Sequence, residues 1–325
     1  MEKLTLKEAA NIKDTLTSGH RLCAGCAHPI IGRMIMKASA DTPIIVTTAT
    51  GCLEVATTIF PFTSWKVPWL HTAFENVAAN ASGIEAAWKA QRRSGKGPLA
   101  KYEKLNVIAY GGDGGTYDIG FQALSGALER GHNFTYVLMD NEAYMNTGIQ
   151  RSGGTPLAAS TTTSPAGHVI PGKAGWKKPI DNIIVAHDIP YVATINPAYP
   201  QDVLDKSRKA FSIEGPKFLH AIIPCTRGWR YPTENTITIA RLATRTCIFP
   251  IYEVERIDGR PVYKLSAASA AIARRPESKK PIKDYLNTQV RFRHLFRPKE
   301  NKELLEAIQD GVDFRWQLLL EKCGY

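Results

Sequence analysis

The feature that most constrains the fold is an alternation of short apolar runs with helix-like segments between about residues 40 and 225. Each run is rich in β-branched or aromatic residues and is apolar throughout, as expected for a strand that is covered on both faces. Strands that alternate with helices at this spacing predict an α/β fold, with a parallel sheet and helices on both of its faces. The expected strands are residues 43–48, 106–110, 134–140, 189–195 and 217–223, and the expected helices are residues 75–93, 119–131, 182–188 and 200–211.

Composition divides the chain into three parts. We expect residues 1–40 to form an N-terminal arm with a pair of cysteines, residues 41–255 to form the α/β domain, and residues 256–325 to form a basic tail that contacts another subunit. Inside the domain, residues 150–178 are rich in Gly, Ser, Thr and Pro and have no periodicity. A loop of this length in a compact domain is usually functional or forms a contact surface.

Positive charge is concentrated near the C-terminus. The formal net charge is +11, and residues 264–302 contain eleven Lys or Arg against three acidic residues. Such a segment can attract an anionic cofactor or an acidic protein, or it can be a solvated surface or a subunit contact. The third interpretation, nucleic-acid binding, is not expected, because the chain has no helix-turn-helix, zinc-finger or aromatic RNA-binding motif.

The chain has features of a cytoplasmic protein. No run approaches the ~18 apolar residues that a membrane-spanning helix needs, so no membrane partner is expected. The first residues, MEKLTLKEAANIKDTL, are polar and are typical of an amphipathic helix rather than of a secretion signal. Six cysteines in such a chain favour metal binding or redox chemistry over structural disulfides.

A glycine-rich turn carries the first candidate site. The strand at 106–110 runs into Gly-Gly-Asp-Gly-Gly at 111–115, a helix follows, and the next strand ends at Asp140 and Asn141. A strand, a glycine turn and a helix N-terminus bring backbone N–H groups to a phosphate at the carboxyl end of a parallel sheet. Asp113 and Asn141, which follow neighbouring strands, make a sensible pair of Mg²⁺ ligands.

Other phosphate sites fit this turn less well. A dinucleotide fingerprint that starts at Gly112 needs a glycine where Tyr117 stands, and the phosphate loop that ends in Gly-Lys-Ser/Thr does not occur. A plain glycine turn with a capping aspartate remains the structural alternative.

Four cysteines form the second candidate site. Cys23 and Cys26 make a CxxC pair, which alone is consistent with a thioredoxin-like pair, half of a zinc site or coincidence. A cubane iron–sulfur cluster needs four thiolates without regular spacing. Cys52 and Cys225 each follow an expected strand of the same sheet, so they can converge beside the diphosphate site.

The two sites together resemble a known family. Gly-Asp-Gly followed 28 residues later by Asn141 resembles the thiamine-diphosphate motif of transketolases, decarboxylases and 2-oxoacid oxidoreductases. That motif ends in two asparagines, and Asp140 is a departure found most readily in the oxidoreductase branch. Five segments in order resemble the β subunit of pyruvate:ferredoxin oxidoreductases, over residues 15–255 and more loosely over 282–295: GHRLCAGCAHPIIGR, TTATGCLEV, GGDGGTYDIGFQALSGALERG, MDNEAYMNTGIQRSGGTP and PCTRGWRYP.

The resemblance implies a thiamine-diphosphate-binding fold and a set of site residues. Mg²⁺ is expected on Asp113, the Asn141 side chain and the Ala143 carbonyl. The Asn146 amide is expected to act on the substrate side and to stabilise an enolate-like intermediate; the alternative is a turn-forming asparagine. The expected ligands of a 4Fe–4S cluster are Cys23, Cys26, Cys52 and Cys225, and the expected thiamine-diphosphate contacts are Gly51, Cys52, Gly112, Asp113, Gly114, Asn141, Asn146 and Thr147.

The implied function is oxidative decarboxylation of a 2-oxoacid, with pyruvate, coenzyme A and ferredoxin as reactants. Other 2-oxoacids (oxalate, aromatic, branched-chain or 2-oxoglutarate), a non-oxidative thiamine enzyme, and a non-catalytic metal- or nucleic-acid-binding protein are the alternatives. The glutamate that activates thiamine is expected from a partner subunit with a pyrimidine-binding domain, so neither Glu54 nor Glu75 is assigned that role. A ferredoxin-like subunit is the other expected partner.

Overall fold

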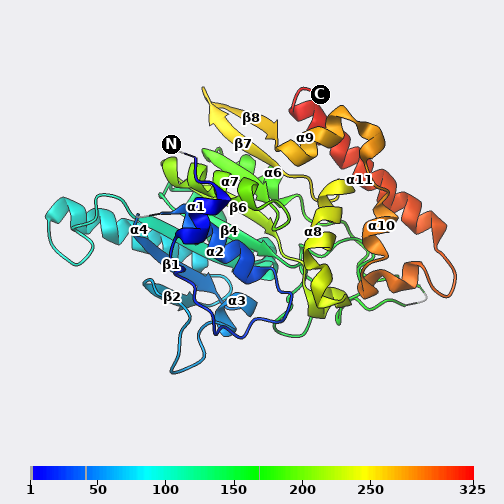
Figure 1. The fold of residues 1–325 in the computed structure, drawn as a ribbon, viewed down its shortest axis with the longest axis horizontal. Coiled ribbons are helices and arrows are strands. Elements are labelled where there is room, and N and C mark those ends of the chain that lie inside the picture. The colour runs from blue at the N-terminus through cyan, green and yellow to red at the C-terminus, as the bar shows by residue number, and fades with distance from the viewer. Residues whose placement is uncertain (1–2, 41, 168) are drawn as a thin grey trace.

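An eight-stranded sheet forms the centre of the protein. The computed structural model describes residues 3–40, 42–167 and 169–325, and its strands follow the order β2-β1-β3-β4-β6-β5-β7-β8 (Figure 1). Neighbours from β2 to β5 pair in parallel, whereas β7 and β8 form an antiparallel hairpin at the edge beside β5. The strands are β1 (Ile44–Ala49), β2 (Trp69–Thr72), β3 (Asn106–Gly112), β4 (Thr135–Asp140), β5 (Tyr191–Ile195), β6 (Lys217–Ile222), β7 (Tyr252–Ile257) and β8 (Arg260–Leu265).

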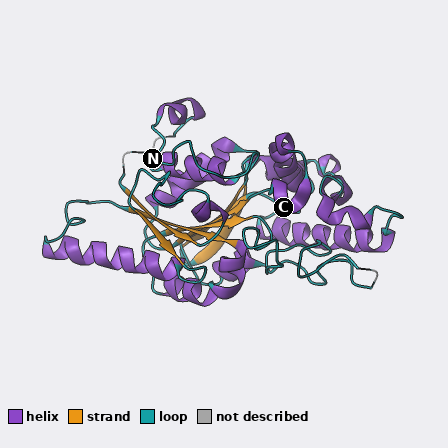
Figure 2. Ribbon diagram, turned by 90° about the horizontal axis from the view of Figure 1, so that it is seen from below, coloured by secondary structure: helices purple, strands orange, loops and turns teal. Residues whose placement is uncertain are grey.

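Two layers of helices cover the sheet, which confirms the expected α/β class (Figure 2). Strand side chains alternate between the faces: Val107 and Leu138 belong to one apolar cluster, and Ile108 and Val137 to the other. The first face packs on α4 (Val77–Ser94), α5 (Phe121–Glu129) and α6 (Ile180–Val185), and the second on α2 (His28–Ala38) and α7 (Pro200–Ser212), with α1 (Leu6–Asn11) beside them.

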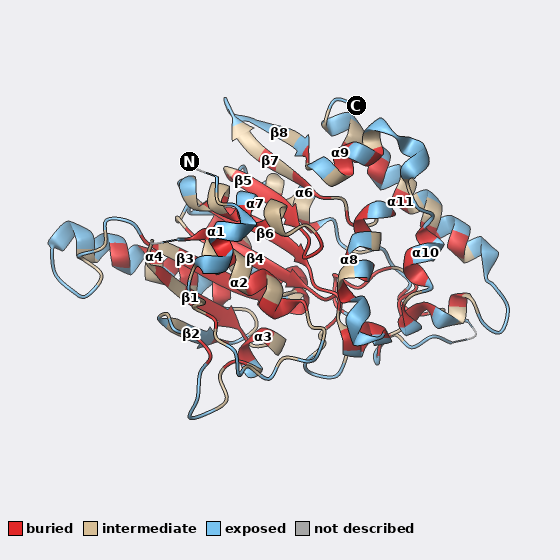
Figure 3. Ribbon diagram, viewed as in Figure 1, coloured by how far each residue is buried: buried red, intermediate tan, exposed pale blue. Residues whose placement is uncertain are grey.

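Three strands were not expected from the sequence. β2 is only four residues long, too short to show a periodic pattern. β7 and β8 are partly exposed and charged, as Figure 3 shows for the edge of the sheet, so they lack the continuous apolar pattern of buried strands. All five expected strands are present.

The segment expected to be a separate C-terminal tail is part of the domain. The expected boundary at residue 255 falls inside β7, and Ile282, Phe292 and Ile308 belong to the same apolar cluster as α4 and α5. The remaining helices are α3 (Cys52–Val55), α8 (Thr236–Arg245), α9 (Ala267–Arg274), α10 (Ile282–Leu286) and α11 (Lys302–Lys322), with π-helical turns at Gly114–Ile119 and Thr226–Arg230 and 3₁₀ turns at Thr233–Asn235, Pro276–Ser278 and Val290–Leu295.

Two further expectations concern the loop at 150–178 and the possibility of a membrane-spanning helix. The described residues of the loop at 150–178 contain neither a helix nor a strand, as predicted. None of the helices in the described part of the chain is both long and apolar enough to cross a membrane.

Candidate cofactor and cluster site

Four neighbouring strands carry the candidate site at their carboxyl ends. Asp113 follows β3, Asn141 follows β4, Cys52 lies just after β1 and Cys225 lies just after β6. Because β1, β3, β4 and β6 are adjacent and parallel, these residues lie along one edge of the sheet. This is the place where parallel α/β sheets bind their ligands.

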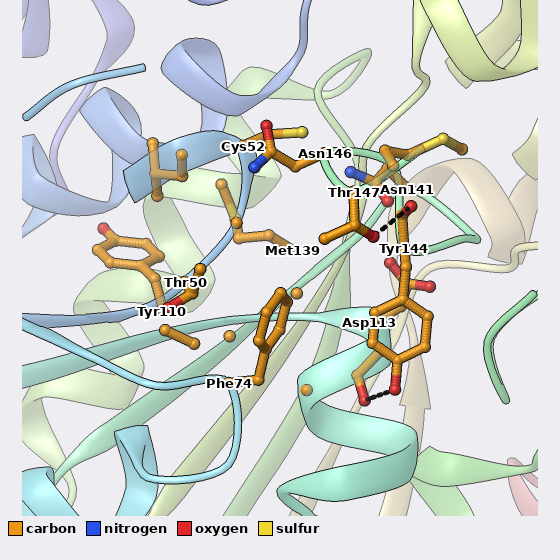
Figure 4. A pocket seen from close by; sticks show the side chains of 18 of the residues that line it. Thr50, Cys52, Phe74, Tyr110, Asp113, Met139, Asn141, Tyr144, Asn146 and Thr147 are labelled. Carbon is orange, nitrogen blue, oxygen red and sulfur yellow. Dashed lines mark hydrogen bonds between the residues drawn. The ribbon is translucent and has the colours of Figure 1, made fainter. Parts of the chain in front are cut away.

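A pocket opens at this edge, and Figure 4 shows it from close by. Asp113 and Tyr144 lie at one end, and Thr50 and Tyr110 at the other. Every residue expected to contact thiamine diphosphate lines this pocket: Gly51, Cys52, Gly112, Asp113, Gly114, Asn141, Asn146 and Thr147.

The glycine turn packs closely against its neighbours at one glycine and has open space beside another. A Cβ atom on Gly114 would collide with the ring of Tyr144, whose hydroxyl donates a 3.0 Å hydrogen bond to the Gly114 carbonyl. A Cβ atom on Gly112, in contrast, would meet open space. The π-helical turn that starts at Gly114 points its first N–H groups toward this edge, which suits a diphosphate.

Three oxygen atoms converge beside the turn. The Asn141 Oδ1 atom lies 2.8 Å from both Asp113 Oδ1 and the Ala143 carbonyl oxygen. Octahedral Mg²⁺ with ligands at ~2.0–2.1 Å places neighbouring ligand oxygens ~2.9 Å apart, so this spacing fits one face of such a site. Without a cation between them these three oxygens lack a donor, and the amide is satisfied when it is turned by 180°, so that its NH₂ group donates to both Asp113 Oδ1 and the Ala143 carbonyl. The oxygen-facing orientation is the one that a bound cation would require.

The Asp113 carboxylate is in surroundings in which a bound cation would stabilise its charge. Its side chain is buried, and the Ser152 hydroxyl donates a short hydrogen bond to its second oxygen. Burial, followed by the nearby charge of Asp140, raises the pKa of Asp113 well above its ordinary value. A bound divalent cation would reverse this effect, because it favours the ionised carboxylate.

Asp140, the departure from the two-asparagine motif, has four hydrogen-bond partners. Its Oδ2 atom receives bonds from the Tyr117 hydroxyl at 2.9 Å, His220 Nε2 at 2.8 Å and Lys177 Nζ at 2.6 Å, and its Oδ1 accepts from the Glu142 N–H at 3.0 Å. Burial alone would raise the pKa of Asp140, but Lys177 and His220 hold it well below its ordinary value. A neutral asparagine at position 140 could not balance the charges of Lys177 and His220. The aspartate that departs from the motif is therefore part of a buried ionic network.

The loop that contains Cys23 and Cys26 packs against the segment that follows Cys225. The Thr226 hydroxyl donates to the Ala24 carbonyl at 3.2 Å, and the Thr236 hydroxyl donates to the Gly25 carbonyl at 2.6 Å. The Cys225 Sγ atom accepts a 3.3 Å hydrogen bond from the Gly228 N–H. Backbone N–H bonds of this kind are typical of iron-cluster thiolates.

The four thiols occupy one neighbourhood. Burial, and then the charges of Cys225, Cys26 and Cys23 in that order, raise the pKa of the Cys52 thiol to about 12. Among the described residues, no three His, Cys, Asp or Glu side chains are close enough to share a single metal ion.

His28 connects the thiols with the cofactor pocket. Its Nδ1 atom lies 3.2 Å from Cys26 Sγ, and its side chain is buried in the wall of the pocket. Burial lowers the pKa of His28 to about 4, so the ring is neutral near pH 7. Burial raises the pKa of the Cys26 thiol to about 12; as an iron-bound thiolate it would only accept hydrogen bonds, and the neutral His28 ring would then carry its proton on Nδ1.

Several site residues were not found from the sequence. His28 could have been noticed because it stands two residues after the CxxC pair, but Ser152, Lys177, His220 and Arg291 carry no local pattern. The unassigned glutamates do not line the pocket among its described residues; Glu54 instead accepts a 3.0 Å hydrogen bond from Thr58. Cys247 and Cys323 belong to another part of the core.

Comparisons with known proteins agree with this geometry. Residues 49–221 match the family model of the C-terminal TPP-binding domain of thiamine pyrophosphate enzymes. Pyruvate synthase subunit PorB of Methanocaldococcus jannaschii is 55% identical over 302 residues, which cover 93% of this chain and 95% of that protein. Ketoisovalerate oxidoreductase subunit VorB of Pyrococcus abyssi is 41% identical over 307 residues, which cover 94% of this chain and 93% of that protein.

A solved structure shares the fold. The 2-oxoglutarate:ferredoxin oxidoreductase from Magnetococcus marinus, with 2-oxoglutarate, coenzyme A and succinyl-CoA bound, aligns with a TM-score of 0.54 at 20% identity. The alignment covers 89% of this chain and 97% of that chain.

Proposed function

Because the chain belongs to the β-subunit family of 2-oxoacid:ferredoxin oxidoreductases, we propose that it is the subunit of a pyruvate:ferredoxin oxidoreductase that binds thiamine diphosphate, Mg²⁺ and a 4Fe–4S cluster. The enzyme converts pyruvate and coenzyme A to acetyl-CoA and CO₂ and passes two electrons to ferredoxin, one at a time. The observation that carries the proposal is the placement of four residues at one edge of one sheet: Asp113 and Asn141 follow β3 and β4, and Cys52 and Cys225 follow β1 and β6.

The oxygen atoms suit a magnesium-bound diphosphate. Asp113, the Asn141 amide and the Ala143 carbonyl would hold Mg²⁺, which would neutralise the charge of the diphosphate. The N–H groups that follow Gly112 bind the diphosphate itself. When bound, thiamine diphosphate supplies a carbanion that attacks the 2-keto group and accepts the electrons left by CO₂.

The pocket wall orients the reactants. Asn146 and Thr147 follow the metal ligands and line the pocket together with Cys52. The Asn146 amide can donate a hydrogen bond to a developing oxyanion without changing its own charge. The pocket therefore brings a substrate-side donor and a candidate cluster thiol to the same cavity.

The thiols suit a cluster that accepts electrons one at a time. Cys23, Cys26, Cys52 and Cys225 ligate the cubane, and the short path from Cys52 to the pocket explains why a cluster can serve as the first acceptor. The activating glutamate comes from a partner subunit, since neither Glu54 nor Glu75 is among the described residues that line the pocket. The isolated chain is therefore inactive.

Pyruvate is preferred as substrate because the pyruvate synthase subunit is the more similar relative, at 55% against 41% identity for the ketoisovalerate subunit. A branched-chain 2-oxoacid is the second candidate, because the ketoisovalerate subunit matches nearly the whole chain.

The test uses the chain co-expressed with its partner subunits and purified without oxygen. We expect a brown protein with about four iron and four sulfide atoms per β chain, beyond those of the partner subunits, as a cubane requires. Viologen reduction should be fastest with pyruvate in a panel of 2-oxoacids. A complex whose β chain holds no iron would refute the electron-transfer role, and a faster rate with 2-oxoisovalerate would move the assignment to the second candidate.

A further inference from the structure

The 3₁₀ turn between α10 and α11 contacts the loop that carries the candidate magnesium ligands Asn141 and Ala143. Arg291 lies in the 3₁₀ turn Val290–Leu295, and its Nη2 atom is 2.5 Å from Glu142 Oε2. Glu142 stands between the ligands Asn141 and Ala143, and both side chains of the ion pair are buried. This ion pair, between residues 149 positions apart in the sequence, therefore connects the turn Val290–Leu295 with the loop that carries Asn141 and Ala143.

Glu142 has an unusual backbone that needs support. Its φ angle is +67°, in the left-handed region that a non-glycine residue rarely adopts. Its N–H donates to Asp140 Oδ1 at 3.0 Å, and its carbonyl accepts from the Thr155 hydroxyl at 2.8 Å. This turn fixes the plane of the peptide between Glu142 and Ala143, and therefore the position from which Ala143 presents its own carbonyl on the next peptide unit.

Two cations from distant segments hold the Glu142 carboxylate. Arg291 binds one oxygen, and Lys177 lies 3.2 Å from the other. Without them Glu142 would be a buried carboxylate with no cationic partner, in the loop between Asn141 and Ala143.

Arg291 also fixes the other side of the loop. Its guanidinium carbon stacks 4.0 Å from the ring centroid of Trp229, and the Trp229 indole N–H donates to the Asn141 carbonyl at 2.9 Å. Its own Nε donates to Gln289 at 2.9 Å, which fixes the guanidinium plane. The arginine thus supports the backbone of two proposed Mg²⁺ ligands by two separate routes.

We propose that Arg291 is a positioning residue of the magnesium site, which holds the Asn141 and Ala143 oxygens in place through Glu142 and Trp229. The inference rests on the proposed function, since it presumes that these oxygens bind Mg²⁺. It also gives Arg291, which lies in the basic C-terminal segment, a function within this chain rather than in a contact with another subunit.

The test compares Arg291→Gln with Arg293→Gln in the complex with its partner subunits, after removal of thiamine diphosphate and Mg²⁺. Arg293 lies on the same turn but is exposed, so it is a matched control. Titration calorimetry measures the affinity for thiamine diphosphate at fixed Mg²⁺. We expect R291Q to bind ~10–100-fold more weakly, the range found when outer partners of metal ligands are removed, and R293Q to bind like the wild type.

A kinetic readout separates positioning from general damage. R291Q should regain a kcat near the wild-type value at saturating Mg²⁺ and thiamine diphosphate, because Arg291 touches neither substrate nor cofactor. Wild-type affinity in R291Q would overturn the inference. If the wild type itself binds no thiamine diphosphate, the proposed function fails instead.

A second pair of variants covers a failure of R291Q to fold. Glu142→Gln is compared with the double variant E142Q/R291Q, which buries no unpaired charge. Equal affinities for thiamine diphosphate in this pair would support action of Arg291 mainly through Glu142. A further ~10-fold loss in the double variant, the lower end of the range for outer partners, would overturn that route.

Discussion

The oxygen end and the thiol end of the site are built differently. At the oxygen end, Asp113, Asn141 and Ala143 lie beside a buried network of ion pairs contributed by distant segments. At the thiol end, the loop with Cys23 and Cys26 is held by hydroxyl and backbone hydrogen bonds, and Cys23 is exposed. From this difference we propose that the protein fixes the candidate magnesium ligands in advance, whereas binding of the proposed cluster completes the arrangement of the thiols.

The largest effect is expected from breaking the oxygen end. Asp113→Asn removes the charged oxygen of the three, so the Mg²⁺-dependent affinity for thiamine diphosphate should fall by at least ~100-fold, more than for an outer partner. Calorimetry on the complex measures it, with the exposed Asp310→Asn as control. If the two ends are independent, the iron content of the D113N complex stays unchanged.

Breaking the thiol end should spare the oxygen end. Cys225→Ser removes one of four thiolates, so we expect loss of the visible absorbance and most of the iron of this cluster. Thiamine diphosphate should still bind within ~3-fold of the wild type, a difference below 1 kcal/mol. Cys323→Ser, which changes a thiol outside the site, should keep its iron. A parallel loss of cofactor binding in C225S would show that the two ends form one unit.

A smaller effect is expected at the residue that joins the two ends. His28→Leu removes the ring nitrogen that lies 3.2 Å from Cys26 Sγ and would donate to a thiolate there. A thiolate without this hydrogen bond would make the cluster harder to reduce. The reduction potential, measured by an EPR-monitored titration, should therefore become more negative. His28→Asn, whose amide can donate from nearly the same place as Nδ1, should restore most of the potential; equal potentials in both variants would rule out the hydrogen bond.

The smallest effect concerns the ionic network beneath the oxygen end. His220 loses solvation on burial, but Asp181 and Asp140 more than offset this and raise its pKa from 6.5 to about 9. It binds its proton more tightly in the folded protein, so its contribution to stability is complete below pH 6.5 and disappears as the pH rises through 9. The difference in melting temperature between the wild type and His220→Gln should shrink over this window by a few degrees. A constant difference would contradict the charged state of His220.

The sequence predicted the parts of the molecule that depend on local pattern. Asp113 and Asn141 were found because each follows an apolar strand, and parallel strands bring their carboxyl ends together. Arg291 and Lys177 were missed because they reach Glu142 across 149 and 35 positions. A single sequence contains no record of such pairings, and a charge run is usually a solvated surface.

The edge of the sheet was missed for a related reason. β8 follows β7 after a two-residue turn at Asp258 and Gly259, but its exposed face and its charged residues hide the alternation that marks a half-buried strand. The expected tail therefore began inside a strand. The conformation of β8 depends on its pairing with β7, and no local sequence pattern indicates this pairing.

The place of Arg291 along the chain has a consequence for biosynthesis. All eight strands precede it, so a chain that grows from its N-terminus holds the complete sheet sequence before this arginine is made. Until then, the turn at Glu142 has Lys177 but not its second cation. We expect a nascent chain to fold its sheet early and to become able to retain its cofactor only after Arg291 has been made.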